Sequence, residues 1–198
     1  MTRTNRPGRF LSIIVALILT VGVPMAALAR PFSEVKYNDV MRVLESSGDP
    51  TPEQFRSCGS GIPSILADIL SGRRIEPEIR VRAARALSRY PGERSRMVLT
   101  STATTPDEDV KVRASCLVGL GRLMGGVSIP DIKPFLADAS PVIREGAATA
   151  LATIGGPRAR QMLLDAISIE PDLEVRMSMD SALNRMSDEE SGGVGSKD

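Results

Sequence analysis

The sequence contains no histidine and no tryptophan, and aromatic residues make up only 3% of its 198 residues. The absence of histidine removes the commonest general base and the commonest metal ligand of proteins. The scarcity of aromatic side chains leaves little from which to build an aromatic-lined ligand pocket or a base-stacking surface. We therefore expect a non-enzymatic protein with no catalytic residues, no cofactor and no metal site.

The N-terminal 29 residues have the features of a secretory signal peptide. Three arginines and no acid precede an apolar run over residues 10–23, and Pro24 ends this run. Ala27-Leu28-Ala29 then supplies small residues at the two positions that signal peptidases inspect. We interpret residues 1–29 as a Sec-type signal peptide cleaved after Ala29, which predicts export to the periplasm or the cell exterior. The alternative is an uncleaved membrane anchor, because the apolar segment approaches the roughly 20 residues that span a bilayer.

The chain also lacks an excess of charge of one sign. The full chain has 25 basic and 24 acidic residues, and removal of the three arginines in residues 1–29 leaves 22 and 24, a net charge of −2. A nearly neutral chain has no bulk electrostatic attraction to nucleic acid or to anionic membranes. We therefore expect a protein partner, no nucleic acid, and no stable membrane span after cleavage.

Cysteine is sparse, with Cys58 and Cys116 as the only two. An exported protein can form disulfides. These two residues are nevertheless 58 positions apart, which is almost two periods of the repeat described below. Packed helices are spaced about 8–10 Å apart, whereas a disulfide needs Cα atoms within about 7 Å. We expect buried, unpaired thiols, with an intermolecular bond at Cys58 as the alternative.

One phrase occurs four times along the chain. In each copy a β-branched residue precedes arginine, and a small residue precedes leucine at the end of a nine-residue motif. The copies start at Ile79, Val112, Ile143 and Val175, which are 33, 31 and 32 residues apart. Self-similarity at such a period is typical of a solenoid of stacked helical hairpins.

Within each copy the apolar spacing is helical. Ile143, Ala147, Leu151 and Ile154 recur at intervals of four, four and three residues, which produces one apolar stripe. Proline or glycine turns follow the first three motifs, and a shorter apolar segment comes after each of these turns, at residues 97–99, 132–136 and 162–164, whereas no second helix follows copy four. One hairpin cannot bury its own apolar face, so we predict an all-α solenoid, a short right-handed superhelix of about four or five stacked hairpins.

The motif resembles HEAT repeats. It is most similar to the short bacterial variety that is also found in phycobilisome lyase-like proteins, and the resemblance covers about residues 76–186. Copy four departs from it, with Met179 and Asp180 where copy three has Ala147 and Ala148. The resemblance implies a stacked array with an extended curved surface for binding another protein.

The arginine of each motif needs an electrostatic explanation. A cation in the first turn of a helix opposes the helix dipole, at a cost of about 0.3–1 kcal/mol. Acids just ahead of the motifs are suitable partners, and arginine can bridge two acceptors with its planar fork. We therefore predict a structural ladder between adjacent repeats, formed by Arg80, Arg113, Arg144 and Arg176 with Asp109, Asp138 and Asp172, and with Glu76 as a further acid.

The remaining segments complete the predicted domain organisation. Residues 30–75 form an N-terminal helical cap, with one amphipathic helix over 33–48 and a second over Ile62–Leu70 that ends at Gly72. Residues 76–186 form the repeats. Residues 187–198 are acidic, rich in glycine and almost without apolar side chains, which predicts a disordered tail.

A second basic group lies near the starts of the second helices. Arg94, Arg96, Arg158 and Arg160 are candidates for a partner-binding edge, although such charges often form only a solvated helix face. The leading hypothesis is thus an exported interaction module that binds a protein on its curved surface. The alternatives are a structural homo-oligomer and, through the repeat subtype, a lyase-type chromophore-attachment enzyme.

Overall fold

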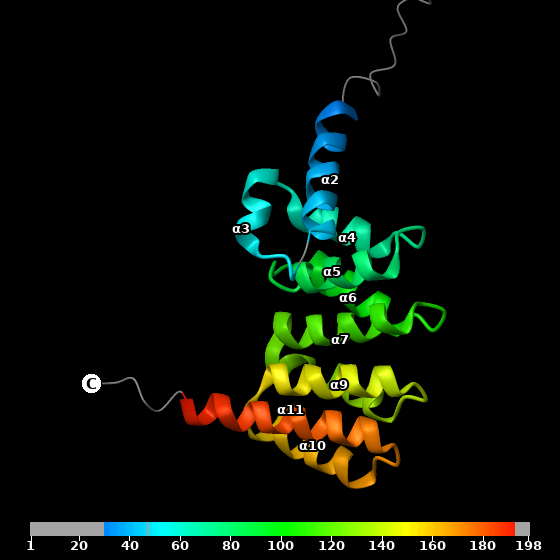
Figure 1. The fold of residues 1–198 in the computed structure, drawn as a ribbon, viewed down its shortest axis with the longest axis vertical. Helices are drawn as coiled ribbons and strands as arrows, with labels where there is room; N and C mark the ends of the chain where they lie inside the picture. Colours follow the sequence, from blue (N-terminus) through cyan, green and yellow to red (C-terminus); the bar gives the residue numbers. More distant parts are fainter. Residues whose placement is uncertain (1–29, 47, 193–198) are drawn as a thin grey trace, which may run out of the picture. The chain divides into compact units, whose positions relative to one another are not determined.

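The computed structural model describes residues 30–46 and 48–192, with side chains described over residues 36–46 and 48–186. This part of the chain contains helices and no strands (Figure 1). In chain order the elements are α2 (Arg30–Glu45), α3 (Pro52–Phe55), η1 (Arg56–Cys58), α4 (Ile62–Ser71), α5 (Pro77–Leu87), α6 (Glu93–Thr104), α7 (Val110–Met124), η2 (Gly125–Ser128), α8 (Ile129–Ile132), η3 (Lys133–Ala137), α9 (Pro141–Ile154), α10 (Gly156–Ile169) and α11 (Leu173–Gly192).

The chain divides into two compact units, residues 1–38 and residues 39–198. Helix α2 spans their junction, and the second unit holds every later element. The segment interpreted as a signal peptide lies outside the described residues. Helix α11 continues through Gly192, so six residues of the predicted tail have helical backbone, and residues 193–198 lie outside the described part.

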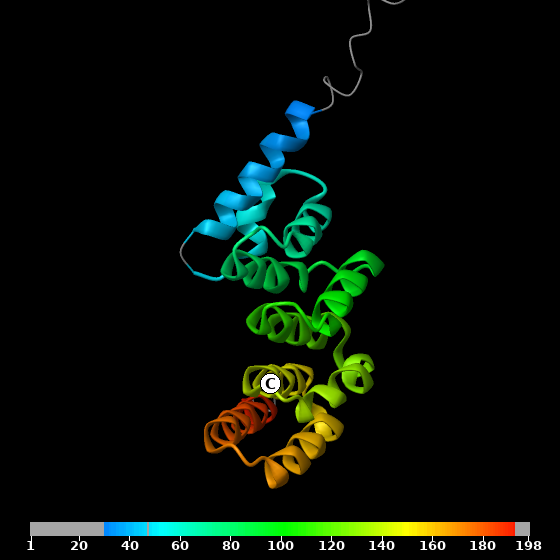
Figure 2. The same ribbon diagram turned by 90° about the vertical axis from the view of Figure 1, so that its right-hand side faces the viewer.

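The second unit is built from two layers of helices. The four helices that carry the repeated motif, α5, α7, α9 and α11, are called the motif helices, and each contacts the next. Figure 2 shows them nearly end-on as a column, with α6, α8, η3 and α10 beside them. This stacking of helical hairpins is the predicted all-α solenoid, and the expectation of the fold class is confirmed.

The apolar stripe of each motif forms the core between repeats. Ile143, Ala147 and Leu151 of α9 each have 0% of their surface exposed, and Val112 and Leu117 of α7 are equally buried. Full burial of a leucine or isoleucine side chain contributes about 1.5–3 kcal/mol. The motif is therefore the seam along which the repeats pack.

Small residues let α7 and α9 approach closely. A Cβ atom added to Gly146 of α9 would lie 2.7 Å from the Cβ and 2.9 Å from the Cα of Ala114 in α7. Near the other end of the contact, a Cβ atom on Gly121 would lie 2.8 Å from the carbonyl oxygen of Ala150. The two helices thus touch through their backbones at two points, which fixes their spacing.

The second helix of the second repeat is broken. The apolar segment around residues 132–136 forms the short α8 and the 3₁₀ turn η3, because Pro130 and Pro134 follow each other within one helical turn and each lacks an N–H donor. Among the described residues, the helical stretch 110–137 that includes this break is the one long and apolar enough to span a membrane. Half of the 18-residue apolar window in that stretch is buried within the protein.

The outer face of α11 carries two polar residues where α9 has buried alanines, together with the exposed apolar side chains of Leu173 and Met177. In α9, Ala148 and Ala152 are buried against the rest of the array. The corresponding residues of α11 are Asp180 and Asn184, and both side chains are exposed. A terminal repeat needs a more polar outer face than an internal one, and Asp180 and Asn184 contribute to it.

Extra arginines in the first motif hold the loop that follows α2. Arg82 of α5, and Arg89 two residues past its end, donate hydrogen bonds to the backbone carbonyls of Ser46, Gly48 and Pro50. Arg85 forms an ion pair with Asp49 of the same loop at 2.8 Å. These contacts explain why copy one carries arginines that the other copies lack.

Both cysteines are free and buried. Cys116 has 0% exposure and packs at the alanine position of its motif. The expectation of buried, unpaired thiols is confirmed.

Candidate functional site

The motif arginines, Arg80, Arg113, Arg144 and Arg176, begin in the first turn of a motif helix, but their guanidinium groups reach backward. The Nε atom of Arg80 donates to the carbonyl oxygen of Leu70 at 2.8 Å, and that of Arg113 donates to Ala103 at 3.1 Å. Leu70 and Ala103 lie in the last turns of α4 and α6. A helix C-terminus has unsatisfied carbonyls and partial negative charge. The C-terminus of the preceding helix therefore stabilises the arginine cation, which the N-terminus of the helix that carries the arginine disfavours.

Each of the first three motif arginines also meets an acid ahead of the next motif helix. Arg80 and Glu108 form two parallel hydrogen bonds, with Nη1 to Oε1 at 2.7 Å. Arg113 contacts Asp138 at 3.3 Å. In the third pair, Arg144 donates to Glu170 from Nε at 2.8 Å and from Nη2 at 2.9 Å.

The same three acids accept backbone hydrogen bonds in their own loops. Glu108 accepts from the N–H of Asp109, Asp138 from Ser140, and Glu170 from Asp172, at 2.8, 2.9 and 3.0 Å. Each carboxylate therefore ties the arginine of one repeat to the loop that starts the next. The arrangement has the geometry of a connection between repeats.

Two of the predicted acids have another task. Asp109 accepts from the backbone N–H groups of Lys111 and Val112 and so caps α7. Asp172 accepts from Glu174 and Val175 at the start of α11 in the same way. The acids that contact Arg80 and Arg144 are instead the first members of the pairs Glu108-Asp109 and Glu170-Pro171-Asp172. In each segment the first acid contacts the arginine and the second caps the motif helix. The presence of two acids close together was therefore the sequence signal for these two roles.

Hydrogen bonds from arginine outweigh the cost of burial and favour the ionised state of these pairs. The side chain of Arg80 is 4% exposed and that of Glu108 is 8% exposed. The hydrogen bonds from Arg80 lower the pKa of Glu108, and those from Arg144 lower the pKa of Glu170. The carboxylates therefore stay charged at neutral pH.

Arg176, the fourth motif arginine, differs from the others. Its Nη1 atom lies 3.5 Å from the carbonyl oxygen of Glu170. Within the described residues it has no carboxylate partner. Glu76, the further acid considered above, takes the N-cap position of α5 without a side-chain cap bond.

The four arginines of the predicted basic edge do not form one uninterrupted cationic surface. Arg94 pairs with Asp68 at 2.6 Å, and Arg96 pairs with Glu93 one turn away. Arg158 lines a small pocket with Gly126 and Gly155, and Arg160 makes its own polar contact. The first two lie on α6 and the last two on α10, with α8 and η3 between them in the chain.

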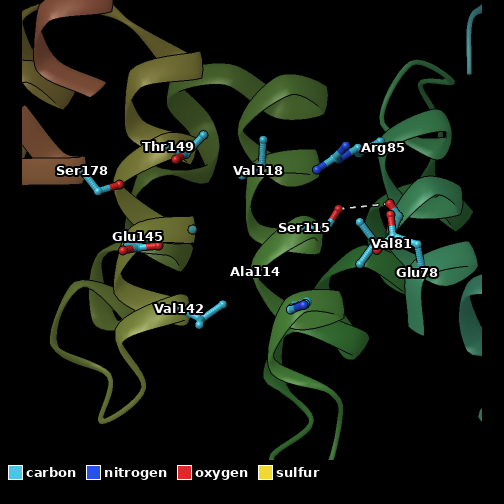
Figure 3. Close-up of a pocket in the computed structure, with 12 residues that line it drawn as sticks. Glu78, Val81, Arg85, Ala114, Ser115, Val118, Val142, Glu145, Thr149 and Ser178 are labelled. Atoms are coloured by element: carbon cyan, nitrogen blue, oxygen red, sulfur yellow. Dashed lines mark hydrogen bonds between the residues drawn. The ribbon is translucent and has the colours of Figure 1, made fainter. Parts of the chain in front are cut away.

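A groove of about 370 Å³ crosses the exposed side of the motif helices. Figure 3 shows side chains from all four motif helices around it. The lining repeats along the array, because the groove takes the residue before each motif and the third, fourth and seventh residues within it. The fourth positions are Ser115, Gly146 and Ser178, and the seventh positions are Arg85, Val118 and Thr149.

Small residues form much of the groove lining. Ala114, Ser115, Gly146 and Thr149 leave backbone close to the surface. The hydroxyl of Ser115 donates to the carbonyl oxygen of Val81 at 3.1 Å and so joins α7 to α5 within the groove. The surface can therefore contact another main chain or a helix at short range.

Charges of both signs lie along the groove. Glu78, Lys111 and Glu145 come from α5, α7 and α9 in that order. Among the described residues these three make no ion pair, whereas Arg85 at the same groove is paired with Asp49. Sequence reasoning did not single out these positions, because a charge between buried helix positions looks like an ordinary solvated side chain.

No metal centre is present in the part of the chain with described side chains, where no three acidic or cysteine residues cluster. A second groove of about 240 Å³ lies between η3 and α10 and is mostly apolar. It is confined to two elements, whereas the first groove involves every motif helix.

Comparison with known families agrees with this architecture. Residues 103–184 match the family model described as HEAT repeats. This HEAT-repeat segment contains α7, α9 and α11, and α5 ahead of it carries the same motif and the same kind of arginine contact. HEAT repeats generally mediate protein–protein interaction. A search of curated proteins finds no match to the sequence.

Proposed function

We propose that this protein is an exported, non-enzymatic HEAT-repeat module that binds another protein through the groove across its motif helices. The observation that carries the proposal is the set of three groove charges, Glu78, Lys111 and Glu145, which have no ion-pair partner among the described residues. Charges that only face water contribute little stability, whatever their order along the motif helices. A binding surface gains specificity and association rate from it.

Site-specific photo-crosslinking tests the binding surface. A photoreactive amino acid replaces Thr149 in the groove, and the matched control carries it at Ser101, an exposed residue of α6. After irradiation in envelope extract, we expect one protein to be cross-linked from position 149 and not from position 101. Equal products from both positions, or none, would contradict the proposal. Cross-links only to a second copy of the chain would support the homo-oligomer instead.

The predicted basic edge serves as a further control. If the groove is the binding surface, charge reversal at Arg158 and Arg160 leaves cross-linking from position 149 unchanged. Loss of the cross-link in this variant, with an unchanged circular dichroism spectrum, would move the proposed interface from the groove to the edge.

Export is tested separately. The composition of residues 1–29 supports a signal peptide. In a bacterial host we expect the protein in the periplasmic fraction, with Arg30 as its first residue by N-terminal sequencing. A full-length chain in the membrane fraction would instead support the uncleaved anchor, and a full-length chain in the cytosol would contradict export.

A further inference from the structure

The order of charges in the groove restricts the kind of partner. Glu78 and Lys111 each immediately precede a motif, and Glu145 is the third residue of the next motif. The array therefore presents a negative, a positive and a negative charge on three successive motif helices. Glu78 and Lys111 are exposed and Glu145 is half-buried, so all three are accessible to a partner.

The spacing between these charges follows from helix packing. Packed helices lie about 8–10 Å apart. Glu145 also lies three residues further along its helix than the other two charges, which is about 4.5 Å. The step from Glu78 to Lys111 therefore runs straight across the array and the step from Lys111 to Glu145 runs obliquely, and each is about 10 Å long.

A partner helix matches this spacing and an extended strand does not. Seven residues of an α-helix rise about 10.5 Å and complete almost two turns, so residues seven apart share one face. In a strand, about three residues cover the same distance, but residues an odd number apart point to opposite sides. A strand would turn its second charge away from the groove.

We infer that the groove binds an amphipathic α-helix of the partner protein that presents a basic, an acidic and a basic side chain seven residues apart. This inference rests on the proposed function. The basic side chains meet Glu78 and Glu145, and the acidic one meets Lys111. Val118 and Val142 contact apolar residues between the charges, and the small side chains of Ala114 and Gly146 allow the helix to approach. The charge pattern is symmetric, so it fits either direction of the partner helix.

Synthetic helical peptides test the inference. The probe carries Lys, Glu and Lys at seven-residue intervals in an alanine-rich background with valines on the same face. The control has the same composition and net charge but places the three charges at five-residue intervals, which spreads them around the helix. With the full chain, fluorescence anisotropy is expected to show at least about tenfold tighter binding of the seven-residue probe, and weaker binding in high salt.

A charge-swapped protein provides the decisive comparison. The triple variant Glu78→Lys/Lys111→Glu/Glu145→Lys is expected to prefer a peptide with Glu, Lys and Glu at seven-residue intervals. Circular dichroism and thermal melting verify that the variant is folded. Should the variant be unfolded, the comparison of seven-residue and five-residue probes on the original protein decides alone.

The two proposals fail in different ways. Equal affinity for both spacings, or an unchanged preference in the folded triple variant, overturns the helix inference. If position 149 still cross-links to a partner protein in that case, the groove stands as the binding surface and only the form of the partner is wrong. Loss of both signals overturns both proposals.

Discussion

The guanidinium group of Arg80 and the carboxylate of Glu108 lie face to face, joined by two parallel hydrogen bonds across a repeat boundary. Arg80 starts α5, and Glu108 belongs to the loop before α7. Both side chains are buried, so removal of either one would leave a charge without water or counter-ion. Such a loss typically costs about 3–5 kcal/mol.

The equivalent pair of Arg144 and Glu170 gives the first prediction. Lysine in place of Arg144 keeps the charge but loses the planar fork that bonds both carboxylate oxygens. We expect Arg144→Lys to lower the free energy of unfolding by about 1.5–3 kcal/mol, measured by urea denaturation. Arg96→Lys, in an exposed pair, is the control and should change it by less than about 0.5 kcal/mol. Unchanged stability together with lost partner binding would show that Arg144 is a binding residue.

Acid should destabilise the fold through the same carboxylates. Hydrogen bonds from arginine hold the pKa of Glu108 and of Glu170 below the ordinary value of about 4.3. The folded state then binds fewer protons than the unfolded state, so their contribution is full above the ordinary pKa and is lost as the pH falls below it.

The double variant Glu108→Gln/Glu170→Gln isolates this contribution. We expect its urea midpoint to depend less steeply on pH than that of the original protein between about pH 3 and pH 5. The control is Glu93→Gln: Arg96 also lowers the pKa of Glu93, but the pair is exposed to solvent, so this variant should reduce the slope far less. Identical slopes for all three proteins would mean that other carboxylates control the acid response.

Leu151 tests the seam between repeats. Its side chain is 0% exposed, and truncation to alanine leaves a cavity that costs about 2–5 kcal/mol of unfolding free energy. Leu164→Ala, at a residue that is 40% exposed on α10, is the matched control and should cost much less. A change below about 0.5 kcal/mol at Leu151 would mean that the motif does not define the packed face.

Gly146 tests the close approach of α7 and α9. Alanine normally stabilises a helix interior relative to glycine by about 1 kcal/mol. At Gly146 the new Cβ would collide with Ala114, so we expect Gly146→Ala to destabilise the protein by about 1–3 kcal/mol. Gly126→Ala is the control, because no atom lies within 4 Å of the added Cβ. A more stable Gly146→Ala protein would show that the helices can separate without loss.

The fold was predictable because its signals are local and repeated. The spacing of Ile143, Ala147 and Leu151 indicates both the helix and its buried face, and the period indicates that such helices stack. The arginines could be located in the same way. Which acid faces each arginine depends on loop geometry, and for this reason Glu108 and Glu170 were missed in favour of their neighbours Asp109 and Asp172.

The groove could not be derived from the sequence in the same way. Glu78, Lys111 and Glu145 look like exposed polar positions on three separate helices. Their proximity depends on the distance and register between repeats, which backbone contacts such as that of Gly146 with Ala114 determine. The break at Pro130 and Pro134 has a local signal instead, because two prolines four residues apart interrupt the backbone hydrogen bonds of a helix.

Asp180 and Asn184 on the outer face of α11 limit how this architecture can change in size. An extra repeat duplicated between α7 and α9 would meet apolar neighbours on both sides and could continue the arginine–acid contacts. The same repeat joined after α11 would have to cover Asp180 and Asn184, and burial of an unpaired charge is costly. Lengthening by internal duplication is therefore favoured over addition at that end, so related proteins with more repeats should differ in the middle of the array and keep polar residues at these two positions of the last helix.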